Sequence, residues 1–412
     1  MTSPSAVLPD QSTPQSIPST AILALSVASF GSGMSMRVTD SMLVRLAGDF
    51  GLTLGMASLV ITVFGVAYGF SQFVFGPLGD RYGKYLVIGR GCLACAVTAT
   101  LCAIAPDFYT LLLARAFGGA TAAAIIPLSM AWIGDVIPYE KRQPVLARFL
   151  IGQILGLSSG ALLGGLCADF LSWRAPFILI AFSFLTIGIY LVRLNRHLPA
   201  HARVLHKAEG GTFTRLFSEF KQVLSTQWAR VVLVTVLLEG ATVFGGMAFV
   251  ASHLHAKYSV SLSSAGAIVM LFGLGGLLFA LRSRLMVARF GESGLVLYGA
   301  LLMSASLTVI AYAPAWWWAV PASFCFGLGF YMLHNTLQIN ATQMAPERRG
   351  TAVAAFASCF FLGQSAGVAA GGVLFTQLGS DHLLAGAGVS VLVIGLVFLR
   401  LHARHHQVAC AS

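Results

Sequence analysis

The sequence predicts an all-α membrane protein in which twelve transmembrane helices form two pseudo-symmetric six-helix bundles. Hydrophobic residues make up 57% of the chain and charged residues only 9%, whereas a soluble domain has about 25% charged residues. The apolar residues gather in runs of roughly 20, the length of helix that crosses a hydrocarbon core of about 30 Å. In addition, the second half of the chain repeats patterns of the first.

Twelve apolar runs, separated by short polar segments, define the expected spans. In chain order they are residues 20–44, 56–77, 85–105, 108–133, 144–168, 174–194, 228–250, 262–285, 293–313, 316–341, 351–375 and 383–401. The longest polar stretch lies between the sixth and seventh spans and is rich in Lys and Arg. The expected domains are a disordered tail (1–19), an N-terminal six-helix bundle (20–194), a cytoplasmic linker (195–227), a C-terminal six-helix bundle (228–401) and a second tail (402–412).

Basic residues indicate the orientation, because cytoplasmic loops carry an excess of Lys and Arg. With the amino terminus inside, Arg45, Arg174 and Lys257 fall outside and Arg37 and Arg115 fall within spans. The other 20 of the 25 Lys and Arg then lie on the cytoplasmic side, so both termini are expected in the cytoplasm. The first 19 residues contain no Lys or Arg, and a cleaved secretory signal is therefore not expected. The net charge of +11 comes from these loops and does not indicate a nucleic-acid partner.

Short patterns recur in the same order in both halves. Arg-Tyr-Gly at 81–83 returns as Arg-Phe-Gly at 289–291, and the glycine-rich segment 155–165 returns as 362–372. Six spans repeated in the same orientation imply a pseudo-two-fold axis along the membrane normal. A binding site is then expected between the halves, near the middle of the membrane.

A short polar interruption lies between the second and third spans. Its residues fit the pattern G-x-L-x-D-R-x-G-R/K at Gly76, Leu78, Asp80, Arg81, Gly83 and Lys84. Through this motif the chain resembles the major facilitator superfamily, where the pattern marks the loop between helices two and three. The resemblance covers about residues 20–401 and implies that family's fold. The segments 37–40 and 336–350 look like its bacterial efflux branch, whose members are described as drug or sugar exporters.

Glycine recurs every fourth residue in the fifth and eleventh spans. Such glycines form a stripe on one helix face, and small residues let neighbouring helices pack closely. The residues assigned to this packing are Gly156, Gly160, Gly164, Gly363, Gly367 and Gly371. The first stripe also resembles the family's antiporter signature G-x(3)-G-P-x(2)-G-G. Ala161 stands where that signature has proline, so antiport does not follow from this motif alone.

Few ionisable side chains lie inside the spans, where they are costly unless paired. Arg37 and Asp40 are three residues apart on one helix face and are expected to pair, either structurally or for function. Arg115 resembles the arginine of a span-four motif that is implicated in proton coupling. An arginine buried this deeply needs an acid or a carbonyl partner. Asp40 is the first candidate and Glu239 the second.

Proton coupling is therefore expected at Arg115, through the resemblance, and at Asp40 and Arg37 as its neighbouring buried charges. Burial favours the neutral form of a carboxylic acid, whereas a nearby cation favours the carboxylate. If the two halves rock, a changing Asp40–Arg115 distance would let the acid bind a proton in one state and release it in the other. No metal ion or cofactor is expected.

Further polar residues lie within other spans. Glu239 is an acid in the seventh span and suits a cationic substrate or a second proton, unless it lies nearer the cytoplasmic boundary. Interhelical hydrogen bonds are the alternative interpretation for the remaining residues. The residues expected to line a substrate cavity are Glu239, His334, Asn335, Gln338, Tyr68 and Gln72.

The resemblance also implies a cytoplasmic gate. In the family, the acid of the loop lies against a helix amino terminus of the other half, and its arginine pairs with an acid near span four. Asp80 and Arg81 are therefore expected to face Asp135. The second half has Ala288 in place of Asp80, so only the first half can carry the complete latch. The gate residues are Gly76, Asp80, Arg81, Gly83, Lys84 and Asp135.

Taken together, these features predict a secondary active transporter and not an enzyme. The expected function is proton-coupled efflux of a small drug- or sugar-like organic molecule by alternating access. Proton-coupled uptake of a sugar, polyol or organic acid is the alternative, and a non-transporting membrane sensor of the same fold is a third possibility. The Gly-x-Ser-x-Gly pattern at 156–160 lacks the strand that a nucleophile elbow requires. The expected partners are the substrate, the proton and the lipid bilayer, and a monomer is expected in the bacterial cytoplasmic (inner) membrane.

Overall fold

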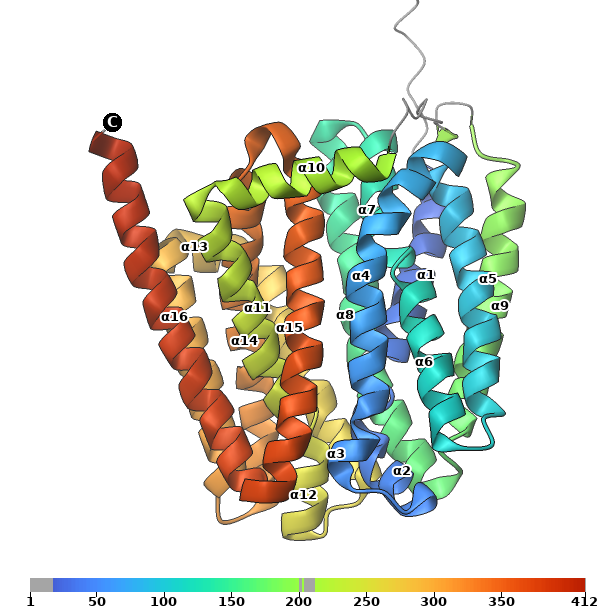
Figure 1. Ribbon diagram of the computed structural model, residues 1–412, viewed down its shortest axis with the longest axis vertical. Helices are drawn as coiled ribbons and strands as arrows, with labels where there is room; N and C mark the ends of the chain where they lie inside the picture. The colour runs from blue at the N-terminus through green and yellow to red at the C-terminus, as the bar shows by residue number, and fades with distance from the viewer. Residues whose placement is uncertain (1–17, 200–201, 204–211, 412) are drawn as a thin grey trace, which may run out of the picture.

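The computed structural model describes residues 18–199, 202–203 and 212–411, and regular structure within them is entirely helical (Figure 1). Ten helical segments of this described part are long and apolar enough to cross a membrane. The protein is therefore a multi-pass membrane protein. The expected tail over 1–19 lies almost wholly outside the described residues.

The first half begins with a span that is broken near its end. Helix α1 ends at Arg37, and a 3-10 turn, η1 (Asp40–Met42), leads into α2. Thr53 caps α3 by accepting a hydrogen bond from the Met56 amide, and Asp107 caps α6 through the Thr110 amide. The helices are α1 (Ser19–Arg37), α2 (Leu43–Phe50), α3 (Leu54–Ala57), α4 (Leu59–Tyr82), α5 (Lys84–Ala103), α6 (Phe108–Ala122), α7 (Ile125–Val136), α8 (Tyr139–Phe170) and α9 (Ala175–Asn195).

The expected linker contains a helix, α10, which lies across one end of the molecule (Figure 1). Residues 200–201 and 204–211 of the linker lie outside the described part. The segment 402–412, expected as a tail, is helical up to Ala411 as the end of α16. The elements of this part are α10 (Thr212–Ser225), α11 (Gln227–Met247), α12 (Val250–Tyr258), α13 (Leu262–Tyr312), η3 (Trp316–Trp318), α14 (Ala319–Gln343), η4 (Pro346–Arg348), α15 (Arg349–Leu378) and α16 (Ser380–Ala411).

Glycine makes the same sharp turn in both halves. The predicted interruption at 76–84 is helical up to Tyr82, and only Gly83 leaves the helix, with φ at 91°. Its counterpart Gly291, with φ at 62°, separates two helical parts of the 51-residue α13. A positive φ strains residues that carry a Cβ atom, which explains why glycine stands at both turns.

The two glycine stripes bring helices of the same half into backbone contact. A Cβ atom added at Gly160 would lie 2.7 Å from the carbonyl oxygen of Met34 in α1, and one at Gly371 would lie 2.6 Å from that of Gly245 in α11. Helices α8 and α15 thus pack on α1 and α11 in the same manner. The remaining stripe glycines make equivalent contacts: Gly156, Gly164, Gly363 and Gly367.

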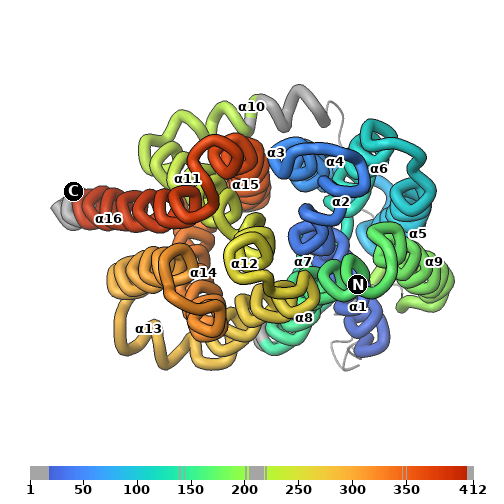
Figure 2. Tube along the Cα trace, turned by 90° about the horizontal axis from the view of Figure 1, so that it is seen from below, coloured from blue at the N-terminus to red at the C-terminus, as the bar shows by residue number. Residues whose placement is uncertain are grey.

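Buried apolar side chains form two large clusters, one drawn mainly from residues 21–202 and one mainly from 223–398. The two groups of helices meet along two seams, α8 against α13 and α3–α4 against α15. We call the end crossed by α10 the linker end and the end holding α2, α3 and α12 the distal end (Figure 1). Figure 2 views the molecule from the distal end, with the first half on the right.

Candidate functional site

Arg37 and Asp40 form a buried ion pair where α1 gives way to η1. Arg37 Nη1 donates to Asp40 Oδ2 at 2.8 Å, and the two side chains are 4% and 2% exposed. The expected pairing is confirmed. Arg37 also reaches the other half, with its guanidinium 4.0 Å from the ring centre of Phe244 and Nη2 3.9 Å from the sulfur of Met247. Because Phe244 and Met247 belong to α11, the pair lies between the halves.

Arg115 is fully buried on α6, and carbonyl oxygens serve as its partners. Its Nη1 donates to the Ser35 carbonyl oxygen at 3.0 Å and its Nε to that of Val60 at 3.2 Å. Of the two acids expected as partners, Asp40 pairs with Arg37 and Glu239 with a histidine, and neither forms an ion pair with Arg115 within the described residues. The prediction that Asp40 or Glu239 pairs with Arg115 is therefore wrong, and its partners are carbonyl oxygens. Asp40 is held by Arg37 of its own segment, and Arg115 binds one carbonyl of α1 and one of α4 instead.

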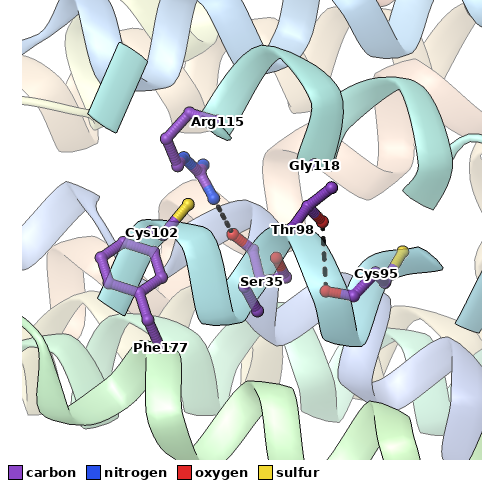
Figure 3. A pocket seen from close by; sticks show the side chains of 8 residues that line it. Ser35, Cys95, Thr98, Cys102, Arg115, Gly118 and Phe177 are labelled. Carbon is purple, nitrogen blue, oxygen red and sulfur yellow. Dashed lines mark hydrogen bonds between the residues drawn. The ribbon is translucent and has the colours of Figure 1, made fainter. Parts of the chain in front are cut away.

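A small cavity of about 10 Å³, roughly the space of one water molecule, adjoins the Arg115 guanidinium. Figure 3 shows Arg115 directed across it toward Ser35, with Thr98, Cys102 and Phe177 around it. Arg115 Nη2 is buried and has no hydrogen-bond partner in the described part of the chain. The two N–H groups of this nitrogen are therefore without an acceptor there, beside a cavity that polar and thiol side chains help to line.

Glu239 and His334, which the sequence placed in the cavity as separate residues, contact each other. His334 Nδ1 lies 2.9 Å from Glu239 Oε2, joining α14 to α11. Glu239 is completely buried, and its Oε1 has no partner among the described residues. His334 is half-buried. The second half therefore holds a buried acid and its partner, as the first half does.

Aromatic rings connect the two pairs. The His334 ring is stacked on Phe330 at a centroid distance of 4.9 Å and lies 4.6 Å from Phe360. The rings of both phenylalanines lie 5.4 Å from that of Phe244, which in turn contacts the Arg37 guanidinium. We call Phe244, Phe330 and Phe360 the aromatic bridge. Sequence reasoning missed the aromatic bridge, because a phenylalanine in a membrane span is expected to face lipid or to pack against another helix.

The other expected cavity residues divide into two groups. Tyr68 and Gln72 are buried one turn apart on α4, and the Tyr68 ring lies 4.3 Å from Phe361 of α15. They therefore lie at a seam between the halves. Asn335 and Gln338 are half-buried on α14, on the same helix as His334.

At the linker end, Lys84 takes the place that the family pattern assigns to Arg81. Lys84 Nζ lies 2.6 Å from Asp135 Oδ2 and 3.0 Å from Asp80 Oδ1. The Arg81 guanidinium instead lies over the ring of Tyr82, 5.2 Å from its centre. The expectation that Arg81 faces Asp135 is thus corrected. Because α4 continues as a helix to Tyr82, residues 80 and 84 come together across the turn at Gly83.

An acid that sequence reasoning overlooked links the halves at the distal end. Asp169, near the end of α8, accepts hydrogen bonds from the backbone amides of Leu262 at 3.2 Å and Ser263 at 2.6 Å. These are the first residues of α13. The only local signal was an acid at the end of a predicted span in a chain with few charges.

The chain matches the family model of the Major Facilitator Superfamily over residues 25–368 and 241–409. It is 23% identical to a probable sugar efflux transporter of Pasteurella multocida, over 92% of this chain and 91% of that protein. It is 32% identical over 151 residues to the multidrug export protein EmrB of Haemophilus influenzae, which is 37% of this chain and 30% of that one.

A solved POT family transporter in complex with 5-aminolevulinic acid has a similar fold, with a TM-score of 0.75. The two chains are 15% identical, and the match covers 96% of this chain and 99% of that one. At this identity the likeness concerns the fold alone.

Proposed function

The chain belongs to the major facilitator superfamily, a family of transporters and not of enzymes, and from this premise we propose that it exports a small drug- or sugar-like organic molecule in exchange for protons. The proposed cycle is alternating access, in which the two halves rock about a site between them. The efflux direction is supported by the relatives named for sugar efflux and multidrug export.

The proposed topology has twelve spans in two six-helix bundles, 20–194 and 228–401, joined by the linker. It counts α13 as two spans that meet at Gly291 and adds α14 to the ten apolar segments. Both termini are proposed to lie in the cytoplasm and the protein to be a monomer of the bacterial inner membrane. The excess of Lys and Arg on one side supports this orientation.

The observation that carries the proposal is the position of the Arg37–Asp40 pair. It is buried, yet Arg37 touches Phe244 and Met247 of the other half. A rocking motion would therefore change the surroundings of Arg37, and with them the balance between charged and neutral Asp40. Asp40 Oδ1, which is buried and has no partner among the described residues, is available for the proton.

Arg115 is proposed to hold this region together and to bias Asp40 from a distance. Its donors fasten α6 to α1 and α4 through the Ser35 and Val60 carbonyls. It forms no ion pair with Asp40 within the described residues, but it holds the Ser35 carbonyl, five residues before that acid. A proton that crosses a membrane potential of 100 mV releases about 2.3 kcal/mol, which suffices for a roughly fifty-fold substrate gradient.

The substrate is proposed to bind beside Glu239, His334 and the aromatic bridge. These residues combine an acid, an imidazole ring and apolar surface, which suits a neutral or cationic molecule with an apolar body. Tyr68, Gln72, Asn335 and Gln338 complete the proposed lining. Few buried charges remain for a polyanionic substrate.

The experiment begins with a growth-inhibition panel in cells that lack or overproduce the protein, which identifies a compound. Transport of that compound is then driven by a pH gradient in proteoliposomes. Asp40→Asn should abolish gradient-driven transport, whereas Asp49→Asn should retain it, since Asp49 belongs to the exposed pair with Arg45 on α2. Retained coupling in Asp40→Asn would refute the proposed role. A gained carbon source instead of resistance would favour uptake.

A further inference from the structure

The contact between Asp169 and α13 crosses from one half of the molecule to the other. Asp169 lies in the last turn of α8, and both of its carboxylate oxygens accept hydrogen bonds, Oδ1 from the Leu262 amide and Oδ2 from the Ser263 amide. The first amides of a helix have no partner within it, and the helix dipole favours a negative charge at that point. Ser261 of the second half accepts from the Ser264 amide, and Asp169 of the first half accepts from the two amides before it.

Close packing of the backbones brings the carboxylate within reach. A Cβ atom added at Gly165, one turn before Asp169, would collide with the carbonyl oxygen of Leu262. One added at Gly266 would lie 2.5 Å from the carbonyl oxygen of Ala161. The α8–α13 seam therefore has no side chains between its two backbones at this level.

The second seam lacks such a link at the repeated position. Gly372 corresponds to Gly165 in the internal repeat, and Thr376 therefore corresponds to Asp169. The Thr376 hydroxyl donates to the Gly372 carbonyl of its own helix at 3.0 Å. Both facing helices carry a cap from their own half, Thr53 on the Met56 amide of α3 and Ser261 on the Ser264 amide of α13. Asp169 adds a second contact to α13, from the other half. The acid-to-helix contact is therefore made at one seam and not at its twin.

We propose that Asp169 is a positioning residue for transport, a reversible latch that holds the distal end closed by capping α13. Opening the distal end must separate α8 from α13 and break both hydrogen bonds. The Asp169 side chain is exposed, so water can take over its hydrogen bonds once the halves part. The latch can therefore open in every cycle. This proposal rests on the proposed rocking of the two halves, and it does not depend on the proposed proton or substrate sites.

The test measures how often the distal end opens, without substrate or gradient. Ser58→Cys serves as the probe, in a background in which the seven native cysteines are replaced. Ser58 is completely buried, and a Cβ atom at Gly372 across the second seam would lie 2.7 Å from its hydroxyl oxygen. Its alkylation by a membrane-impermeant maleimide in purified protein then reports the open population, provided that reclosing is faster than labelling.

Asp107 provides a matched control, because it caps α6 at the same end but within its own half. Asp169→Ala should raise the alkylation rate about fivefold, the effect of one anion at an exposed helix terminus. Asp107→Ala should leave the rate unchanged. The nearly isosteric Asp169→Asn, which keeps one acceptor, should give a smaller increase and replaces Asp169→Ala if that variant does not fold.

Two results would refute the proposal that Asp169 is a latch. One is an unchanged alkylation rate in both Asp169 variants. The other is an equal increase in Asp107→Ala and Asp169→Ala, which would mean that the loss of any cap loosens the distal end. Because no transport is measured, either result leaves the proton-coupling proposal standing, and failure of that proposal leaves the latch standing.

Discussion

The two halves of the molecule share their backbone contacts and differ in their charges. Each half packs a glycine stripe on its first helix and turns at an equivalent glycine, Gly83 or Gly291. Each also buries one acid that has one oxygen bonded and one without a partner in the described residues. The partner of Asp40 is an arginine at 2.8 Å, however, and that of Glu239 is a histidine at 2.9 Å.

The two buried acids therefore have partners of different chemistry, an arginine for Asp40 and a histidine for Glu239. Arginine stays protonated in proteins, so the first pair changes its net charge only at Asp40. A neutral histidine ring can still donate one hydrogen bond, so the contact between His334 and Glu239 does not require a charged ring. The internal repeat therefore gives the two halves similar backbone packing, whereas the side chains around the buried acid differ between them.

The largest loss of folding stability is expected when Arg37 is replaced by an uncharged residue. Arg37→Met leaves Asp40 buried without its partner, and losing one member of a buried pair typically costs about 3–5 kcal/mol of folding stability. Thermal unfolding in detergent measures the loss. Arg37→Met combined with Asp40→Leu should recover most of it, because no unpaired acid remains. A double variant as unstable as the single one would show that the guanidinium stabilises the fold by packing alone.

A smaller loss of folding stability is expected when the backbone packing that the two halves share is disturbed. Gly156→Ala and Gly363→Ala should each cost about 1–3 kcal/mol, because the new methyl group meets a carbonyl oxygen of α1 or α11. Gly386→Ala is the control, since nothing lies within 4 Å of a Cβ atom there. It should be neutral or slightly stabilising. Equal stability of all three variants would contradict the close packing of the stripes.

The second pair should tolerate replacement better than the first. His334→Gln retains a donor for Glu239 and should cost about 1 kcal/mol or less, whereas His334→Leu leaves the acid without one and should cost about 1–3 kcal/mol. Both are compared by unfolding in detergent at neutral pH. If His334→Gln proved as harmful as Arg37→Met, the second pair would behave as a fixed ion pair, and the contrast between the halves would disappear.

The smallest effect concerns a cap present in one half only. Hydrogen bonds from the Thr110 amide and hydroxyl lower the pKa of Asp107, whereas Ala315, which precedes η3 in the second half, has no side-chain cap. Stabilisation by a carboxylate with a lowered pKa is present above its unfolded pKa and is lost as pH falls through the folded one. Hydrogen-exchange protection of the Thr110 amide, corrected for intrinsic rates, should therefore fall below about pH 4. In Asp107→Ala it should be low throughout and independent of pH.

Local properties of the sequence determined the fold class and one part of the site. Apolar length indicates a membrane helix without reference to any neighbour, so the series of membrane helices could be predicted. Arg37 and Asp40 could be paired because residues three apart on a helix face the same way. The glycine stripes and the turns at Gly83 and Gly291 also follow from spacing and from the lack of a Cβ atom.

Tertiary structure alone decided which distant side chains meet. Glu239 and His334 are 95 residues apart, and Asp169 lies 93 residues from Leu262. Such contacts depend on how each helix is rotated and how far it is shifted along its neighbour, and spacing along the chain does not determine either quantity. The same is true of Arg115, which binds carbonyls of α1 and α4, and of Lys84, which reaches Asp135 in place of Arg81. Side-chain types restricted the possible partners, and helix packing selected among them.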